Sequence, residues 1–202
     1  TDETLKAIGR HHTVQETIDK FWLARKEGMN NINMDLIIGL PNEGMEEFEH
    51  SIEETAKMQP ESLTVHTLSF KRASEMTHNR DRYKVANRQT AEKMMNRAKE
   101  WTAENNYVPY YLYRQKNIVG NLENIGYSKP GEESIYNIAI MEEVQTIIGL
   151  GCGASSKFVH ADTGKIEQYH NPKEPAAYIM TYEDSINKKI ELLNDMYGVK
   201  SK

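Results

Sequence analysis

The segment from Asn31 to Pro41 limits the possible folds of this chain most, because it has the pattern of a buried strand with a carboxylate in its middle. Side chains alternate along a strand, which places Ile32, Met34, Leu36 and Ile38 on one face and Asn33, Asp35, Ile37 and Gly39 on the other. A buried carboxylate without a partner is costly or has a shifted pKa, so we expect Asp35 to face a cation, a hydrogen-bond donor or a ligand. The interior of a parallel barrel would provide such surroundings.

Helices and strands alternate through the first half of the sequence. The capping-box spacing of Thr13–Glu16 predicts a helix that ends near Gly28, ahead of the strand. A second amphipathic helix is expected from Met45 to Pro60, followed by a second strand over residues 63–70. This order and spacing suit a βαβ unit with two parallel strands.

The second half has a different pattern. A third helix is predicted over residues 85–105, and residues 107–113 read as a strand in which Pro109 marks a sheet edge or a bulge. We place a domain boundary between them, which gives domains of residues 1–106 and 107–202. The remainder predicts short strands around residues 136–140 and 146–150, a glycine-rich turn at Gly149–Gly153, and a final helix with Tyr182, Ile186, Ile190 and Leu193 on one side.

Composition narrows the partners that the chain could have. The net charge of −5 comes from interspersed acidic and basic residues, so nucleic acid is not an expected partner. No apolar run is long enough to cross a bilayer and the first residues do not resemble a signal peptide, which predicts a cytoplasmic location without membrane contact. The seven histidines lack paired-ligand spacing and Cys152 is the single cysteine, so neither a metal site nor a disulfide is expected within the chain.

The start of the chain suggests that further sequence precedes it. The chain begins without methionine, directly before a helix, and offers too few βα units to close a barrel. We therefore expect an α/β fold that is the C-terminal part of a partial parallel (β/α) barrel, followed by a small α+β domain. Such a partial barrel exposes strand edges, so we also expect domain contacts, dimerisation or low solubility.

Four segments in this order resemble the radical S-adenosylmethionine (SAM) family of oxygen-independent coproporphyrinogen III oxidases, and especially its coproporphyrinogen dehydrogenase branch. They are Leu5–His12, Asn31–Pro41, Leu63–Ser69 and Gly149–Ala154. The Asp-Leu-Ile-x-Gly-Leu-Pro string in the second segment is the most specific, and residues 113–117 with 120–124 are similar to a signature of that branch. The resemblance covers nearly the whole chain and implies that the barrel is a radical SAM barrel.

The resemblance implies that four residues contact SAM. Arg10 and Asp35 match family positions that do so through their side chains, Ser69 matches a position that acts mainly through its backbone, and Ser155 matches another. A guanidinium can bind the SAM carboxylate bidentately, and an aspartate can accept from its ammonium or ribose hydroxyl groups. The residues alone also allow other readings: Arg10 as a surface charge at a helix end, Asp35 as a buried structural hydrogen-bonding residue, and the glycine-rich loop as a strand-to-helix turn that needs positive φ.

The resemblance also implies a [4Fe-4S] cluster, but the chain has no CxxxCxxC loop and Cys152 cannot replace it. We expect the cluster ligands in a missing N-terminal part, and no catalysis by this chain alone. For the complete enzyme the resemblance implies reductive cleavage of SAM and oxidative decarboxylation of two propionates of coproporphyrinogen III, which gives protoporphyrinogen IX in haem biosynthesis. Candidate cations for the propionates of this porphyrinogen substrate are Lys71, Arg72, Arg114 and Lys116, although each also reads as solvated surface charge.

Two other functions stay open at this point. Close relatives of these oxidases bind haem, so a haem-binding chaperone on the same scaffold is one alternative. The other is a plain α/β domain that holds a phosphate ligand in the glycine-rich loop.

Overall fold

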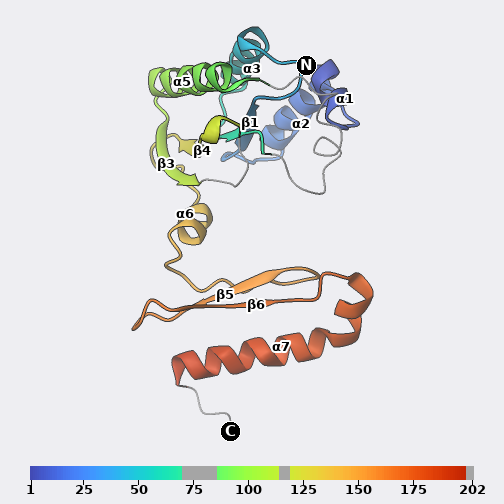
Figure 1. Cartoon of the computed structure of the whole chain (residues 1–202), viewed down its shortest axis with the longest axis vertical. Helices are drawn as coiled ribbons and strands as arrows, with labels where there is room; N and C mark the ends of the chain where they lie inside the picture. Colours follow the sequence, from blue (N-terminus) through green and yellow to red (C-terminus); the bar gives the residue numbers. More distant parts are fainter. Residues whose placement is uncertain (70–85, 114–118, 199–202) are drawn as a thin grey trace. The chain divides into compact units, whose positions relative to one another are not determined.

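The structure, a computed structural model, describes residues 1–69, 86–113 and 119–198 and divides into two compact units, Thr1–Ser134 and Ile135–Lys202. The elements of the first unit are α1 (Asp2–Ala7), α2 (Val14–Lys26), β1 (Asn33–Ile38), α3 (Met45–Met58), β2 (Ser62–Thr67), α5 (Arg88–Glu104), β3 (Val108–Tyr113), the short 3₁₀-helix η2 (Val119–Asn121) and β4 (Asn124–Ser128). Those of the second are α6 (Ile135–Met141), β5 (Ser155–Val159), β6 (Ile166–His170) and α7 (Pro175–Tyr197) (Figure 1). Among the described residues, no helix is both long and apolar enough to cross a membrane.

A four-stranded sheet in the order β1-β2-β4-β3 organises the first unit. β1 and β2 are parallel, as the βαβ prediction requires, whereas β4 runs antiparallel to both of its neighbours. β3 lies at the edge of the sheet and its register shifts between Pro109 and Tyr111, so both readings of Pro109 are confirmed.

One face of this sheet is packed against α3 and α5, which lie together on the same side of the strands (Figure 1). The fully apolar positions of the strands point to this face, and the helices contribute their apolar stripes. The buried cluster comprises Ile38, Phe48, Ile52, Leu63, Val65, Ala91, Met94, Met95, Ala98, Trp101, Tyr107, Ile125 and Tyr127. A bidentate pair also joins the two helices, because Arg97 donates from Nε and Nη2 to the Glu49 carboxylate at 2.8–3.0 Å. The methionines and the tryptophan of α5 are thus core residues.

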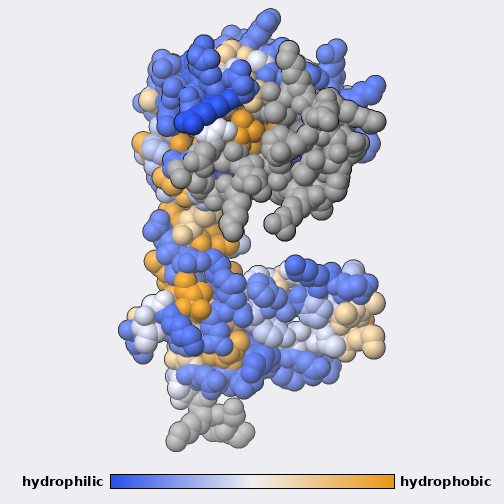
Figure 2. All heavy atoms as spheres, viewed as in Figure 1, coloured by the Kyte–Doolittle hydropathy of each residue, from blue (hydrophilic) through white to orange (hydrophobic). Residues whose placement is uncertain are grey.

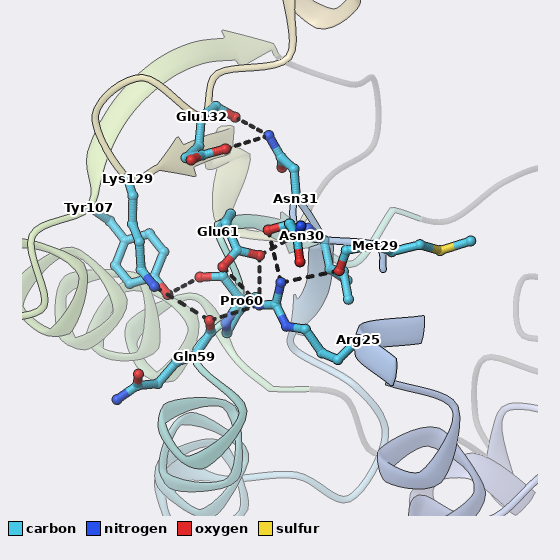
Figure 3. A network of polar contacts seen from close by, with 11 residues as sticks. Arg25, Met29, Asn30, Asn31, Gln59, Pro60, Glu61, Tyr107, Lys129 and Glu132 are labelled. Atoms are coloured by element: carbon cyan, nitrogen blue, oxygen red, sulfur yellow. Dashed lines mark hydrogen bonds and ion pairs between the residues drawn. The ribbon is translucent and has the colours of Figure 1, made fainter. Parts of the chain in front are cut away.

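The amino-terminal ends of β1 and β2 are fixed by a network around Arg25 and Glu61 (Figure 3). Arg25 Nη2 lies 2.6 Å from Glu61 Oε2, and the same guanidinium donates to the carbonyls of Asn30 at 2.9 Å and Gln59 at 3.2 Å. Glu61 Oε2 also accepts from the backbone N–H of Ile32 at 3.1 Å. The network therefore joins the end of α2 to the starts of both parallel strands.

The second unit is a β5–β6 hairpin with α7. The two strands pair antiparallel, and the ring of Phe158 on β5 is fully buried. Tyr169 donates from its hydroxyl to Ser185 Oγ of α7 at 3.3 Å. Large apolar side chains of this unit are exposed on α6, on the segment that leads from it to β5, and on α7; Figure 2 shows hydrophobic colour over α6 and that segment.

Several predicted elements are confirmed and others are wrong. The helix after Thr13 carries the predicted capping box, in which Glu16 N donates to Thr13 Oγ1 and Thr13 N donates to Glu16 Oε2. The final helix is confirmed as α7. Residues 136–140 are wrong as a strand, because they lie in the helix α6, and residues 146–150 form only an isolated bridge between Ile147 and Lys157.

The observed division of the chain differs from the predicted boundary after residue 106. Contacts separate the units after Ser134, because β3 and β4 continue the sheet that begins with β1 and β2. The change of sequence pattern near Tyr107 coincides with the change from parallel to antiparallel strands within one sheet and not with the end of the unit.

Candidate functional site

The sheet face opposite α3 and α5 carries polar side chains from three strands. Asp35 of β1, Thr64 of β2, Gly126 of β4 and Tyr111 of β3 occupy matched positions across the sheet. Asn33, His66 and Tyr113 lie two residues along their strands from these positions, on the same face. We call Asn33, Asp35, Thr64, His66, Tyr111 and Tyr113 the polar face.

Asp35 is exposed, and the expectation of a buried carboxylate is wrong. Its side chain keeps 58% of its accessible surface, because the strand is packed on one face only and Asp35 lies on the other. The expectation of polar partners is correct. Asn33 Nδ2 donates to Asp35 Oδ1 at 2.8 Å, and His66 Nε2 lies 3.5 Å from Asp35 Oδ2.

The partners of Asp35 are linked in turn to two tyrosines of β3. Thr64 donates from Oγ1 to Asn33 Oδ1 at 3.2 Å and lies 3.2 Å from the Tyr111 hydroxyl. His66 Nδ1 lies 3.1 Å from the Tyr113 hydroxyl. The two tyrosine rings are stacked, with centroids 6.4 Å apart and planes 13° apart. Two lines of polar contacts thus run from β3 across the sheet to Asp35.

The surroundings of Asp35 favour its ionised form. The His66 side chain has the largest effect and lowers the pKa of Asp35, and the Asn33 and Thr64 side chains lower it further, against an opposing effect of partial burial. The pKa of Asp35 therefore lies below its usual value. The carboxylate is an acceptor that is both ionised and open to a ligand.

The carboxyl ends of the parallel strands lie beside this face. Ser69, two residues beyond β2, is half-buried, and Leu68 N donates to the Ile38 carbonyl of β1 at 2.9 Å. Asn124 accepts at Oδ1 from the backbone N–H of Thr67 at 2.7 Å, while its buried Nδ2 has no partner among the described residues. Asn124 alternates with the core residue Ile125, which places it on the side of the polar face. A buried donor without a partner is a group that a ligand acceptor could satisfy.

Arg10 lies in the loop between α1 and α2, and its side chain is exposed. Its backbone N–H donates to the Leu5 carbonyl at 2.8 Å, which closes the end of α1. The side chain makes no hydrogen bond or ion pair with another residue of the described ranges. The structure therefore does not bring Arg10 into contact with Asp35.

Ser155 begins β5 in the second unit and is exposed. The glycine-rich loop before it has the predicted positive φ at Gly151 and Gly153, and the buried Lys189 of α7 donates to the Gly149 carbonyl at 3.0 Å. The loop leads into a strand and not into a helix, so that part of the prediction is wrong. It also lacks the helix N-terminus that the phosphate-binding alternative would use.

The four predicted substrate cations, Lys71, Arg72, Arg114 and Lys116, lie outside the described residues. Within the described ranges, no group of three or more His, Cys, Asp or Glu side chains is placed to hold a metal ion. The residues that the sequence analysis missed are the neighbours of Asp35. Period-two polar positions in β2, at Ser62, Thr64 and His66, were the signal that could have found them.

Comparison with known proteins agrees with this fold. The oxygen-independent coproporphyrinogen-III oxidase-like protein HemZ of Bacillus subtilis is 66% identical over 97% of this chain, and the chain covers 39% of that protein. The chain is therefore similar, over nearly its whole length, to an oxygen-independent coproporphyrinogen-III oxidase-like protein. The resemblance read from the sequence is confirmed. The chain spans about two fifths of the length of this relative.

Further relatives are more distant. The heme chaperone HemW of Haemophilus influenzae is 22% identical over 94% of this chain, which covers 46% of that protein. Among solved structures, coproporphyrinogen III oxidase (HemN) of Escherichia coli, a radical SAM enzyme, has a TM-score of 0.62 over 91% of this chain and 41% of its own, at 17% identity. That likeness confirms the predicted radical SAM fold with its partial barrel. No protein-family profile matches the chain.

Proposed function

We propose that this chain contributes a SAM-contacting wall to a radical SAM enzyme that decarboxylates coproporphyrinogen III oxidatively to protoporphyrinogen IX. The observation that carries this proposal is the exposed, ionised carboxylate of Asp35 on the polar face of the sheet. Its position within the Asp-Leu-Ile-x-Gly-Leu-Pro string is the one that the family resemblance assigns to SAM. The identity to the HemZ protein over nearly the whole chain supports the choice of substrate class.

The described residues fit SAM in their chemistry. SAM presents an ammonium group and ribose hydroxyls, which an ionised aspartate accepts, and acceptor atoms that a free amide donor such as Asn124 Nδ2 could satisfy. Asp35 would accept from SAM, and the backbone near Ser69 would contact it at the carboxyl ends of β1 and β2. Arg10 and Ser155 stay in the proposal as further SAM contacts on the strength of the resemblance. When bound, SAM would supply the radical chemistry of the family.

The described residues do not fit an iron-sulfur cluster. Such a cluster requires three cysteine thiolates in this family, and the chain has one cysteine, Cys152, in the glycine-rich loop. The proposal therefore assigns the cluster ligands to residues outside this chain. Lys71, Arg72, Arg114 and Lys116 are proposed to bind the propionates of the substrate.

An anaerobic turnover assay of the complete protein tests the proposal. With SAM, a reductant and coproporphyrinogen III, we expect protoporphyrinogen IX from the wild type and a loss of at least about 100-fold from Asp35→Ala, since a charge-assisted contact to a bound cofactor is removed. Asp19→Asn provides the matched control, because Asp19 is an exposed carboxylate of α2 away from the sheet. Turnover that is unchanged in Asp35→Ala would contradict the proposed contact.

A haem-binding chaperone is the second candidate, because relatives named heme chaperone match nearly the whole chain. The same protein distinguishes the two functions. Tight haem binding and transfer without any protoporphyrinogen formed would support the chaperone and exclude the oxidase.

A further inference from the structure

The polar face contains two lines of polar contacts, and both end on Asp35. In the first line, Thr64 has a single hydroxyl proton and gives it to Asn33 Oδ1 at 3.2 Å. The Thr64 oxygen can therefore only accept from Tyr111, whose hydroxyl lies 3.2 Å away. The Asn33 amide then donates to Asp35 Oδ1 at 2.8 Å. Every step points from Tyr111 towards the carboxylate.

The second line has the same direction. An ionised carboxylate only accepts, so the contact of 3.5 Å between His66 Nε2 and Asp35 Oδ2 is favourable in the His66 form that carries a proton on Nε2. In the neutral imidazole, Nδ1 is then without a proton and accepts from the Tyr113 hydroxyl at 3.1 Å. With this tautomer, Tyr113 holds the Nδ1 side of His66 while Nε2 presents a donor to Asp35.

We infer that Tyr111 and Tyr113 are positioning residues for Asp35, each acting across β2 through a directed line of hydrogen-bond donors. One line reaches each carboxylate oxygen, which fixes the plane of the carboxylate while leaving lone pairs on its open side for a ligand. The inference rests on the proposed contact between Asp35 and SAM.

The backbone holds both tyrosines in place for this role. Tyr111 lies over Gly126, where a Cβ atom would be 1.9 Å from the ring, so only glycine lets the ring reach Thr64. The bulge between Pro109 and Tyr111 determines which side chains of β3 lie on the same face of the sheet as Asp35. Thr64 is almost fully buried, at 3% exposure, so water does not readily replace its hydroxyl in the first line.

Substitutions within each line test the inference on the chain as it is. Thr64→Val keeps the shape and removes the hydroxyl, Thr64→Ser keeps the hydroxyl, and Tyr113→Phe removes the start of the second line. Tyr127→Phe provides the matched control, because it removes a tyrosine hydroxyl from the same sheet on the core face. Two readouts are needed: the Asp35 carboxyl titration of the chain by carbon-13 NMR, which requires no ligand, and the SAM affinity of the complete protein by calorimetry.

We expect Thr64→Val and Tyr113→Phe each to raise the pKa of Asp35 and to weaken SAM binding by about three- to tenfold, as for the loss of one hydrogen bond in a network. Thr64→Ser should restore both values, and Tyr127→Phe should change neither. An Asp35 titration that is the same in Thr64→Val, Tyr113→Phe and the wild type would overturn the inference.

The two readouts separate this inference from the proposed function. If Asp35→Ala abolishes SAM binding while Thr64→Val and Tyr113→Phe leave both readouts unchanged, the positioning lines are wrong and the proposed contact stands. If the titration shifts as expected but SAM affinity is insensitive to Asp35→Ala, the lines exist and the proposed contact is wrong. If the complete wild-type protein does not bind SAM, the proposed contact is again contradicted, and the titration alone decides whether the lines hold Asp35.

Discussion

The ring of Tyr111 fills the space above Gly126, and a Cβ atom at that glycine would lie 1.9 Å from Tyr111 Cε1. The two residues are register partners on β3 and β4, and Gly126 also faces Thr64 of β2. Because Gly126 of β4 has no side chain, Tyr111 of β3 reaches past it and contacts β2, which is not a neighbour of β3 in the sheet. This relationship connects β3 to the candidate site.

We expect Gly126→Ala to displace the Tyr111 ring and to lower the free energy of unfolding by about 1–3 kcal/mol, as overpacking does. The measurement is chemical denaturation, together with NMR of the Tyr111 ring. The double variant Gly126→Ala/Tyr111→Ala is the control, because the added methyl group then has room. A cost of Gly126→Ala that is the same with and without the Tyr111 ring would show that the contact does not cause it.

We expect Glu61→Gln to lower the free energy of unfolding by about 1–3 kcal/mol at neutral pH, since Arg25 loses its charged partner. Burial raises the pKa of Glu61, but the Ile32 N–H and Arg25 outweigh it, so the pKa lies below its usual value. A carboxylate with a lowered pKa in the folded state stabilises the folded protein at pH values above its unfolded-state pKa of about 4.3. This stabilisation is lost as the pH falls through the folded-state pKa.

The difference in stability between wild type and Glu61→Gln should therefore be constant near neutral pH and shrink below about pH 4. Denaturation midpoints of both proteins, measured at evenly spaced pH values from pH 7 to pH 3, check this expectation. A difference that grows as the pH falls would contradict the assignment of the Glu61 charge to this network.

Arg97 and Arg88 on α5 give a matched comparison of two ion pairs. Arg97 holds Glu49 of α3 through two nitrogens, whereas Arg88 pairs with Glu92 one turn along the same helix and is well exposed. We expect Arg97→Lys to cost about 0.5–1 kcal/mol through the loss of bidentate geometry, and Arg88→Lys to leave the free energy of unfolding nearly unchanged. Thermal unfolding of the two variants measures both. Equal effects would mean that the ion pair between α3 and α5 contributes no more to stability than the surface pair does.

Two glycines of the loop before β5 should respond differently to alanine. A Cβ atom at Gly149 would lie 2.4 Å from the Ser155 carbonyl oxygen, whereas Gly151 has open space but a φ of +95°. We expect Gly149→Ala to loosen the contact with β5 at a cost of about 1–3 kcal/mol, and Gly151→Ala to cost about 1 kcal/mol through backbone strain alone. Hydrogen exchange of residues 147–160 in the whole chain distinguishes them, because only Gly149→Ala should lose protection in β5.

Much of the fold could be predicted because its signals are local. The capping box of Thr13 and Glu16, the apolar stripes of α3 and α5, and the alternation along β1 all depend on residues within one element. Pro109 marked an edge strand with a bulge for the same reason, since its missing N–H limits where it can lie.

Other elements could not be read in this way. Residues 136–140 alternate in a manner that suits a strand, yet they form α6, because tertiary context overrides weak local preference in a short segment. The position of β4 between β2 and β3 depends on pairing between residues far apart in the sequence, which no local pattern encodes.

For the candidate site, the sequence by itself determined that Asp35 lies in a strand, that its face is the polar one, and that the chain resembles the oxygen-independent coproporphyrinogen III oxidases. Only the tertiary structure decided that this face is open and that Asn33 and His66 are the partners of the carboxylate. It also decided that Tyr111 and Tyr113 reach them from the far edge of the sheet. The reason is that alternation fixes the direction of a side chain within its own strand, whereas its neighbours are fixed by strand order and register, which arise from contacts across the whole sheet.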